Sequence, residues 1–330
     1  MWLPILGVMA AVRQGGTMVE IIRASDMGFC MGVRRAVQIM EEEASPERPV
    51  FSVGEIVHNP HVVRSLEERG VVQLPGPDEV VGDVGKATAE RVRRGRVAIT
   101  AHGVGERVVK ELQASGLEII DTTCPIVTRA QRYGQKFARE GWHLLIFGDP
   151  RHKEVRGILG WTGGPNGEQN ATVVPQADLE SLRRLVEEFP GGFPNKIGVM
   201  AQTTHKMEDF AQFVANLMLL RRDFNFEIHV VNTLCHATTG QQEAAAALAR
   251  KVDVMIVVGG KKSANTRHLR EVAEEQGTRA FHIEGPEELE ASWLVGVERI
   301  GLTAGASTPD FSVDAVEARI RELTGDVAAV

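Results

Sequence analysis

The chain has 330 residues, 25% of them charged, and a formal net charge of −7. Its length provides for roughly two or three domains, and its acidic balance argues against general nucleic-acid binding and against a polybasic membrane-binding surface. Its three cysteines leave at least one thiol unpaired, and it lacks the run of roughly 18–20 apolar residues that spans a bilayer. We therefore expect a protein of the reducing cytoplasm, with no nucleic-acid and no membrane partner.

The first 18 residues are expected to form an N-terminal extension. They are largely apolar, but they contain Pro4, and no lysine or arginine precedes the apolar run as it does in a signal peptide. From residue 19 onward, short β-branched runs alternate with amphipathic segments, which predicts parallel sheets with crossover helices. The predicted strands are 19–25, 49–55, 96–101, 117–123, 143–148, 196–202, 226–232, 252–260 and 299–305. The clearest predicted helices are 33–44, 127–141 and 239–251.

The cysteines occupy equivalent points in this alternation, each between a predicted strand and a predicted helix. They are Cys30, Cys124 and Cys235. The residues 28 positions after them lie in the polar loop that follows the next predicted strand, and these are His58, His152 and Ser263. A third strand follows in each unit, and the loop at its end contains His102, Thr203 and Ser307 respectively. We therefore predict three copies of one α/β unit, at 19–116, 117–223 and 224–330, related by pseudo-threefold symmetry around a central cavity.

Three thiols at one cavity would suit a metal site that keeps one position open. The candidates are zinc with a histidine as fourth ligand and an iron–sulfur cluster, which soft thiolates favour. Taken singly, each cysteine could instead be a small buried hydrophobic residue. The repeated placement favours the metal site.

The other polar residues at the predicted strand ends divide into two chemical groups. Compact donors near helix starts suit a phosphate or diphosphate, because free backbone N–H groups and the helix dipole favour anions there. These donors are His58, His102, Thr238, Ser263, Asn265 and Ser307. Helix capping and ordinary buried histidines are the alternatives. The second unit instead offers His152, Glu154 and Thr203, a set suited to proton delivery.

Several motifs in the chain together resemble those of the 4-hydroxy-3-methylbut-2-enyl diphosphate reductase family. They are GFCMGVRRA, VHNP, AHGV, DTTCP, a His-x-Glu loop, QTT, a Cys-x-Ala-Thr-Thr run, a Ser-x-Asn loop and TAGAST, in this order over residues 19–325. The resemblance implies three α/β units arranged as a trefoil around a [4Fe–4S] cluster with one open iron. It implies Cys30, Cys124 and Cys235 as cluster ligands.

The resemblance also implies roles for the remaining residues. His58, His102, Ser263, Asn265 and Ser307 would hold the diphosphate, Thr203 and Glu154 would lie near the substrate hydroxyl, and His152 would contact substrate or tune the proton relay. The implied reaction is reductive dehydration of (E)-4-hydroxy-3-methylbut-2-enyl diphosphate to isopentenyl and dimethylallyl diphosphate, the last step of the methylerythritol phosphate route to isoprenoids. Ferredoxin or flavodoxin would supply the electrons. We expect a monomer or weak homodimer.

One position departs from the family pattern, and two other functions stay open. Ala264 stands where many members have a second serine, and Lys261 and Lys262 could compensate for the missing hydroxyl or face solvent. One alternative function is a dehydrating [4Fe–4S] enzyme like quinolinate synthase, which needs no electron donor. The other is a non-enzymatic zinc or iron–sulfur sensor.

Overall fold

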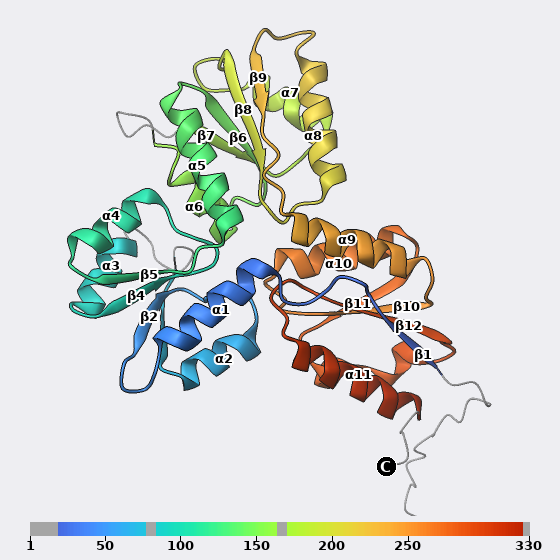
Figure 1. Cartoon of the computed structure of the whole chain (residues 1–330). Coiled ribbons are helices and arrows are strands. Elements are labelled where there is room, and N and C mark those ends of the chain that lie inside the picture. Colours follow the sequence, from blue (N-terminus) through green and yellow to red (C-terminus); the bar gives the residue numbers. More distant parts are fainter. Residues whose placement is uncertain (1–18, 77–83, 164–169, 326–330) are drawn as a thin grey trace, which may run out of the picture.

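The computed structural model describes residues 19–76, 84–163 and 170–325, so the expected N-terminal extension lies outside the described residues. The described chain contains three separate four-stranded parallel sheets (Figure 1). Sheet I has the order β3-β2-β4-β5 (Val71–Leu74, Val50–Val53, Arg96–Ile99, Glu118–Asp121). Sheet II has the order β7-β6-β8-β9 (Ala171–Val174, His143–Phe147, Lys196–Ala201, Glu227–Val230). Sheet III has the order β11-β10-β12-β1 (Arg279–Ile283, Val254–Val258, Arg299–Ala304, Glu20–Arg23). The predicted α/β fold is confirmed.

The sheets are offset by one strand from the sequence repeats. Strand β5, expected to open the second repeat, pairs with β4 of sheet I, and β9 pairs with β8 of sheet II. Strand β1 pairs with β12, so the first described strand completes the last sheet and closes a ring of three sheets. Each sheet is therefore assembled from two repeats, and the division of the chain at residues 116 and 223 stays a prediction.

All nine predicted strands are present, but three further strands were not predicted. These are β3, β7 and β11, and each is one of the two edge strands of its sheet. The other edge strands, β5, β9 and β1, were predicted, although they are at least as exposed. Exposure at a sheet edge therefore does not by itself explain why β3, β7 and β11 were missed.

Helices cover both faces of the sheets. Leu145 and Phe147 of β6 pack in a cluster that includes residues of α7 and α8, whereas Leu144 and Ile146 pack in a second cluster with residues of α5 and α6. The helices are α1 (Met31–Glu43), α2 (Pro60–Glu68), α3 (Val84–Val92), α4 (Glu106–Ala114), α5 (Pro125–Arg139), α6 (Lys153–Leu159), α7 (Leu179–Glu187), α8 (Met207–Leu220), α9 (His236–Ala249), α10 (Ala264–Glu275) and α11 (Asp310–Thr324). Among the described residues, no helix combines the length and apolarity needed to cross a membrane.

Candidate active site

The carboxyl ends of the strands in all three sheets point toward the centre of the molecule (Figure 1). Ligands of parallel α/β sheets bind at this edge. One cavity with about 100 Å³ of free volume lies there, and all twelve predicted site residues line it. They are Cys30, His58, His102, Cys124, His152, Glu154, Thr203, Cys235, Thr238, Ser263, Asn265 and Ser307. The sequence therefore predicted correctly which residues meet, while their individual roles stay predictions.

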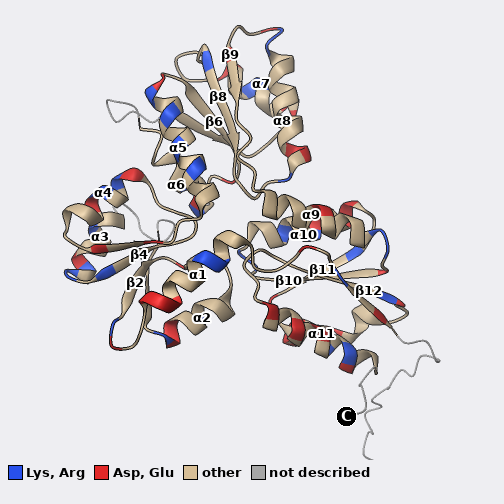
Figure 2. Ribbon diagram, viewed as in Figure 1, with Lys and Arg blue, Asp and Glu red and all other residues tan. Residues whose placement is uncertain are grey.

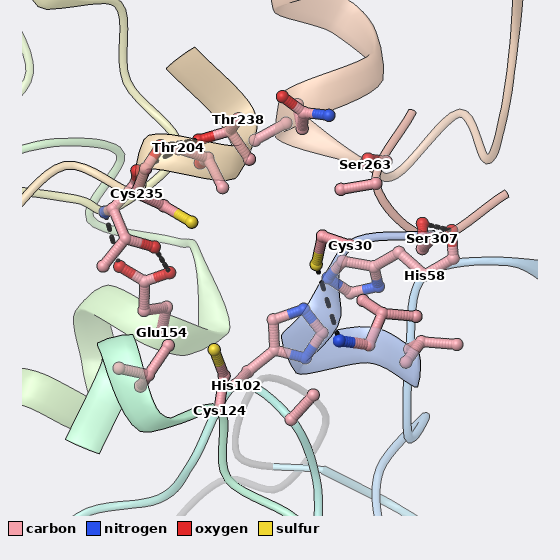
Figure 3. Close-up of a pocket in the computed structure, with 18 of the residues that line it drawn as sticks. Cys30, His58, His102, Cys124, Glu154, Thr204, Cys235, Thr238, Ser263 and Ser307 are labelled. Carbon is pink, nitrogen blue, oxygen red and sulfur yellow. Dashed lines mark hydrogen bonds between the residues drawn. The ribbon is translucent and has the colours of Figure 1, made fainter. Parts of the chain in front are cut away.

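The three cysteines are placed by the same backbone hydrogen bond. The N–H groups of Cys30, Cys124 and Cys235 each donate to a carbonyl in the loop after the neighbouring strand. The acceptors are Ala306 O at 3.1 Å, Ala101 O at 3.0 Å and Thr203 O at 2.8 Å, respectively. Each cysteine is also the N-cap of the helix that follows it. Because these contacts repeat, the three sulfur atoms face a common space (Figure 3).

Three thiols that face one cavity are soft ligands of the kind that iron–sulfur clusters use. Burial raises the pKa of Cys30 and of Cys124, and the negative charge of Cys235 raises both further, so a bound cationic group would stabilise the thiolates. Within the described parts of the chain, no three His, Cys, Asp or Glu side chains lie close enough to hold one ion. A side chain at Gly32 would overlap with the Cys124 sulfur, which shows how closely α1 approaches the thiol.

Glu154 and Thr203 form a buried pair at the cavity wall. The Glu154 Oε1 atom accepts from the Thr203 backbone N–H at 2.7 Å, and Oε2 lies 2.7 Å from the Thr203 hydroxyl. The two residues are only 2% and 4% exposed. Burial raises the pKa of the Glu154 carboxyl, although the contacts with Thr203 oppose that shift. Burial thus favours the protonated form of this carboxyl more than it would in an exposed glutamate.

Three histidines form a second cluster at the same cavity. The ring centroid of His58 lies 4.2 Å from that of His102 and 6.0 Å from that of His152. Burial lowers the pKa of His102 well below its usual range and lowers that of His152 to about 3, and the charge of His58 contributes to both shifts. The His102 Nδ1 atom finds no hydrogen-bond partner among the described residues. The histidine cluster can therefore donate hydrogen bonds to an anion, and the anion would in turn stabilise the protonated imidazoles.

Glu55 is a site residue that the sequence analysis missed. Its Oε2 atom lies 3.1 Å from His58 Nδ1 and 3.9 Å from Lys153 Nζ, and its Oε1 atom lies 3.0 Å from Lys262 Nζ. The hydrogen bond with His58 and the two ammonium groups hold the Glu55 pKa at about 2. Glu55 therefore stays ionised and fixes the orientation of His58. The only sequence signal is its position three residues before that histidine.

The serine residues serve as helix caps or loop ties and still line the cavity. The Ser263 hydroxyl oxygen accepts from the Thr266 N–H at 3.2 Å at the start of α10, and the Ser307 hydroxyl donates to the His58 carbonyl at 3.1 Å. Capping was the alternative considered for Ser263. It does not exclude ligand binding, because a capping hydroxyl keeps its own proton to donate.

Asn265 and Thr238 are tied to neighbouring backbone and side-chain groups. The Asn265 amide nitrogen donates to Gln241 Oε1 at 2.9 Å, and Gln241 in turn donates to the Gly28 carbonyl at 2.8 Å. The Thr238 hydroxyl donates to the Cys235 carbonyl at 3.0 Å. Gln241 thus fixes the Asn265 amide, a second contribution that the sequence did not reveal.

The lysines beside Ala264 do not compensate for its missing hydroxyl. Lys262 is exposed and pairs with Glu55, and Lys261 Nζ lies 2.6 Å from Glu288. Neither lysine lines the cavity, whereas Ala264 does. Of the two possibilities kept open from the sequence, orientation toward solvent is the observed one.

Fold and cavity together define a class of α/β proteins with three sheets around a central cavity, in which three thiols lie beside a histidine cluster. The model of the LytB protein family matches residues 21–321. The chain belongs to the LytB protein family. The resemblance seen in the sequence motifs is thereby confirmed.

Individual relatives agree with this assignment. A 4-hydroxy-3-methylbut-2-enyl diphosphate reductase of Geobacter sulfurreducens is 40% identical over 307 residues, which cover 92% of this chain and 98% of that protein. The solved structure of an (E)-4-hydroxy-3-methyl-but-2-enyl diphosphate reductase, the terminal enzyme of the non-mevalonate pathway, aligns with a TM-score of 0.60 at 37% identity, over 92% of this chain and all of that one. The Plasmodium falciparum reductase aligns with a TM-score of 0.76 at 26% identity, over 92% and 88% of the chains.

Proposed function

We propose that this chain is a 4-hydroxy-3-methylbut-2-enyl diphosphate reductase that releases isopentenyl and dimethylallyl diphosphate. The observation that carries the proposal is one cavity shared by three equivalently placed thiols, a histidine cluster and a buried acid. The identity with curated reductases over nearly the whole chain supports it.

The reaction consumes two electrons and two protons. The C–O bond of the allylic alcohol breaks, the oxygen leaves as water, and one C–H bond forms. A group that holds a proton close to the leaving hydroxyl is therefore needed, since proton transfer by a positioned acid contributes about 10²- to 10⁴-fold to rate. We assign this role to Glu154, a carboxyl at the cavity wall whose pKa is raised by burial, although its contacts with Thr203 oppose that shift.

The diphosphate end is assigned to the opposite wall. Hydroxyl and amide groups of Ser263, Asn265 and Ser307 lie beside His58 and His102 there. A diphosphate would bring negative charge to the buried His102 imidazole, and this favours its protonated, doubly donating form. Thr238 completes the wall near Cys235, and His152 lies between the anion pocket and the acid.

Cys30, Cys124 and Cys235 are the proposed ligands of a [4Fe–4S] cluster. When bound, such a cluster would supply single electrons and an open iron that acts as a Lewis acid. Ferredoxin or flavodoxin is the proposed source of the electrons. We place the protein in the cytoplasm, where free thiols and a reduced donor persist. A monomer or weak homodimer remains our expectation.

The two alternative functions explain fewer of the observed features of the cavity and of the relatives. A quinolinate synthase-like reaction needs no electron donor, and the curated relatives cited above are reductases. A sensor needs no buried acid, so it leaves the Glu154–Thr203 pair without a purpose.

The test is anaerobic purification followed by metal analysis and an activity assay. We expect about four irons per chain, and formation of both five-carbon diphosphates from the hydroxylated substrate with reduced methyl viologen as donor. Iron-loaded protein that forms no five-carbon product would refute the proposed reaction. A colourless protein with one zinc per chain would refute the cluster.

A further inference from the structure

The residue that follows each cysteine is exposed. Met31 is 70% exposed, and Pro125 and His236 are also classed as exposed. These residues are the first of α1, α5 and α9. Each proposed ligand is therefore followed in the chain by a residue that a partner protein can reach.

A basic groove lies beside these helix starts. It comprises Arg35, Arg129, Arg132 and Lys136, encloses about 470 Å³, and is also lined by Asp121, Thr123, Pro125, Thr128 and Tyr133. Figure 2 shows the basic residues along α5 and at the start of α1. The groove holds four cationic side chains and one carboxylate, although the chain as a whole carries a net charge of −7.

The groove is tied directly to the cysteine loops. Arg35 donates from Nη1 to the carbonyl of Thr123, the residue before Cys124, at 3.3 Å. Arg129 donates from Nη2 to the carbonyl of Asn232, in the segment that leads to Cys235, at 3.0 Å. The groove thus borders the backbone of two of the three proposed cluster ligands.

Within the described residues, the cations of the groove have few carboxylate partners. Among the described residues, no carboxylate forms an ion pair with Arg35, Arg129 or Arg132, and Lys136 makes only an i,i+4 pair with Glu140 at 3.8 Å. Arg129, Arg132 and Lys136 lie on one face of α5 at spacings that place like charges together, which destabilises a helix. Such a stripe is better explained by an anionic partner than by folding.

We propose that the basic groove docks a small acidic electron-donor protein of the ferredoxin or flavodoxin type. This inference rests on the proposed function, because only a reductase without its own electron source needs such a partner. Each donor gives up one electron, so two dockings supply the two electrons of one turnover, while the substrate takes up two protons and releases water. Pro125 is an exposed apolar residue that lines the groove, and the cations around it would steer an acidic partner.

The decisive variant is Arg132→Glu, because no hydrogen bond or ion pair involving Arg132 is present in the described structure. Its matched control is Arg94→Glu, which changes the chain charge equally. Arg94 is exposed and precedes β4, so it lies at the amino end of sheet I, away from the cysteines. Activity is measured with a reduced acidic ferredoxin and, separately, with reduced methyl viologen, a small donor that needs no docking surface.

We expect Arg132→Glu to raise the KM for ferredoxin about tenfold at low salt, with wild-type turnover in methyl viologen. The difference should shrink at 0.5 M salt, because screening shortens the reach of surface charges. Arg94→Glu should match wild type with both donors. An unchanged ferredoxin KM in Arg132→Glu would overturn the docking site while leaving the proposed function intact.

Two other outcomes are distinguishable. If wild-type, iron-loaded protein forms no product even with methyl viologen, the proposed function itself fails. If Arg132→Glu alters self-association in sedimentation experiments and leaves the ferredoxin KM unchanged, the groove is an interface between copies of this chain and the docking proposal is refuted.

Discussion

Replacing Glu154 by glutamine tests the proposed proton donor with little disturbance of the structure. Glu154 makes two contacts, one with the Thr203 N–H and one with the Thr203 hydroxyl, both at 2.7 Å. A glutamine side chain can keep both, because its oxygen accepts from the N–H and its amide donates to the hydroxyl oxygen. What it cannot do is release a proton to a leaving hydroxyl.

The expected magnitudes follow from this geometry. Since both hydrogen bonds are retained, the free energy of unfolding of Glu154→Gln should stay within about 1 kcal/mol of wild type. Loss of a positioned acid should lower kcat by about 10²- to 10⁴-fold, which corresponds to about 2.7–5.4 kcal/mol of activation free energy. The effect on rate should therefore exceed the effect on stability several-fold.

The assay compares kcat with reduced methyl viologen, iron content and substrate affinity by calorimetry on the same preparation. Iron content and affinity should match wild type. Thr203→Val is the companion variant, because it keeps the backbone N–H contact and removes only the hydroxyl, so its loss of rate should be smaller. A kcat for Glu154→Gln within about threefold of wild type would remove Glu154 from the proton-donor role. A rate loss matched by iron loss would show a structural effect instead.

Three further changes probe the thiol centre and the histidine cluster. Cys124→Ser should lower the iron content per chain, and a full complement of iron would disprove ligation by this thiol. In an ordinary helix, a change of glycine to alanine stabilises by up to about 1 kcal/mol. Gly32→Ala should instead lower the iron content, because the added methyl group would overlap with the Cys124 sulfur. Gly134→Ala in α5 should keep its iron, because its added methyl group would lie 3.2 Å from the nearest atom, on the Thr162 side chain. The pKa of His152 is lowered to about 3 in the folded protein. Below pH 6.5 the unfolded chain therefore takes up a proton that the folded chain does not, and the free energy of unfolding decreases as the pH is lowered. When the pH is lowered from 7.5 to 5.5, the free energy of unfolding of the cluster-free wild type, measured in urea, should fall by roughly 1 kcal/mol more than that of His152→Asn. This value is smaller than the full effect of the pKa shift because His152 keeps some solvent access. Parallel pH profiles of the two proteins would contradict this prediction.

The sequence identified the site through spacing rather than through local motifs. The equal interval of 28 residues from Cys30 to His58 and from Cys124 to His152 placed these residues at equivalent strand ends, and parallel sheets then brought the strand ends together. The buried central strands were equally clear, because unbroken apolar runs such as that of β10 have few alternatives.

The features that the sequence did not reveal depend on contacts between distant segments. Glu55 acquires its function from Lys262, 207 residues away, and from Lys153, and neither pairing leaves a local pattern. Gln241 likewise matters only because it contacts Asn265 and the Gly28 carbonyl. Strands β3, β7 and β11 were also missed, although the other three edge strands, β5, β9 and β1, were predicted, so exposure at a sheet edge does not by itself account for the difference.

The offset between repeats and sheets links assembly of the metal site to closure of the ring. Cys30 reaches the cavity because β1 pairs with β12 and because its N–H donates to the Ala306 carbonyl. Arg23, at the end of β1, strengthens this junction through contacts with Asp314 at 2.7 Å and Glu317 at 2.6 Å on α11. These contacts join segments almost 300 residues apart, and contacts of such long sequence separation form slowly in folding. The Cys30 thiol is therefore held beside the other two by the pairing of the first described strand with the last sheet, so the three-thiol cavity depends on closure of the ring of sheets.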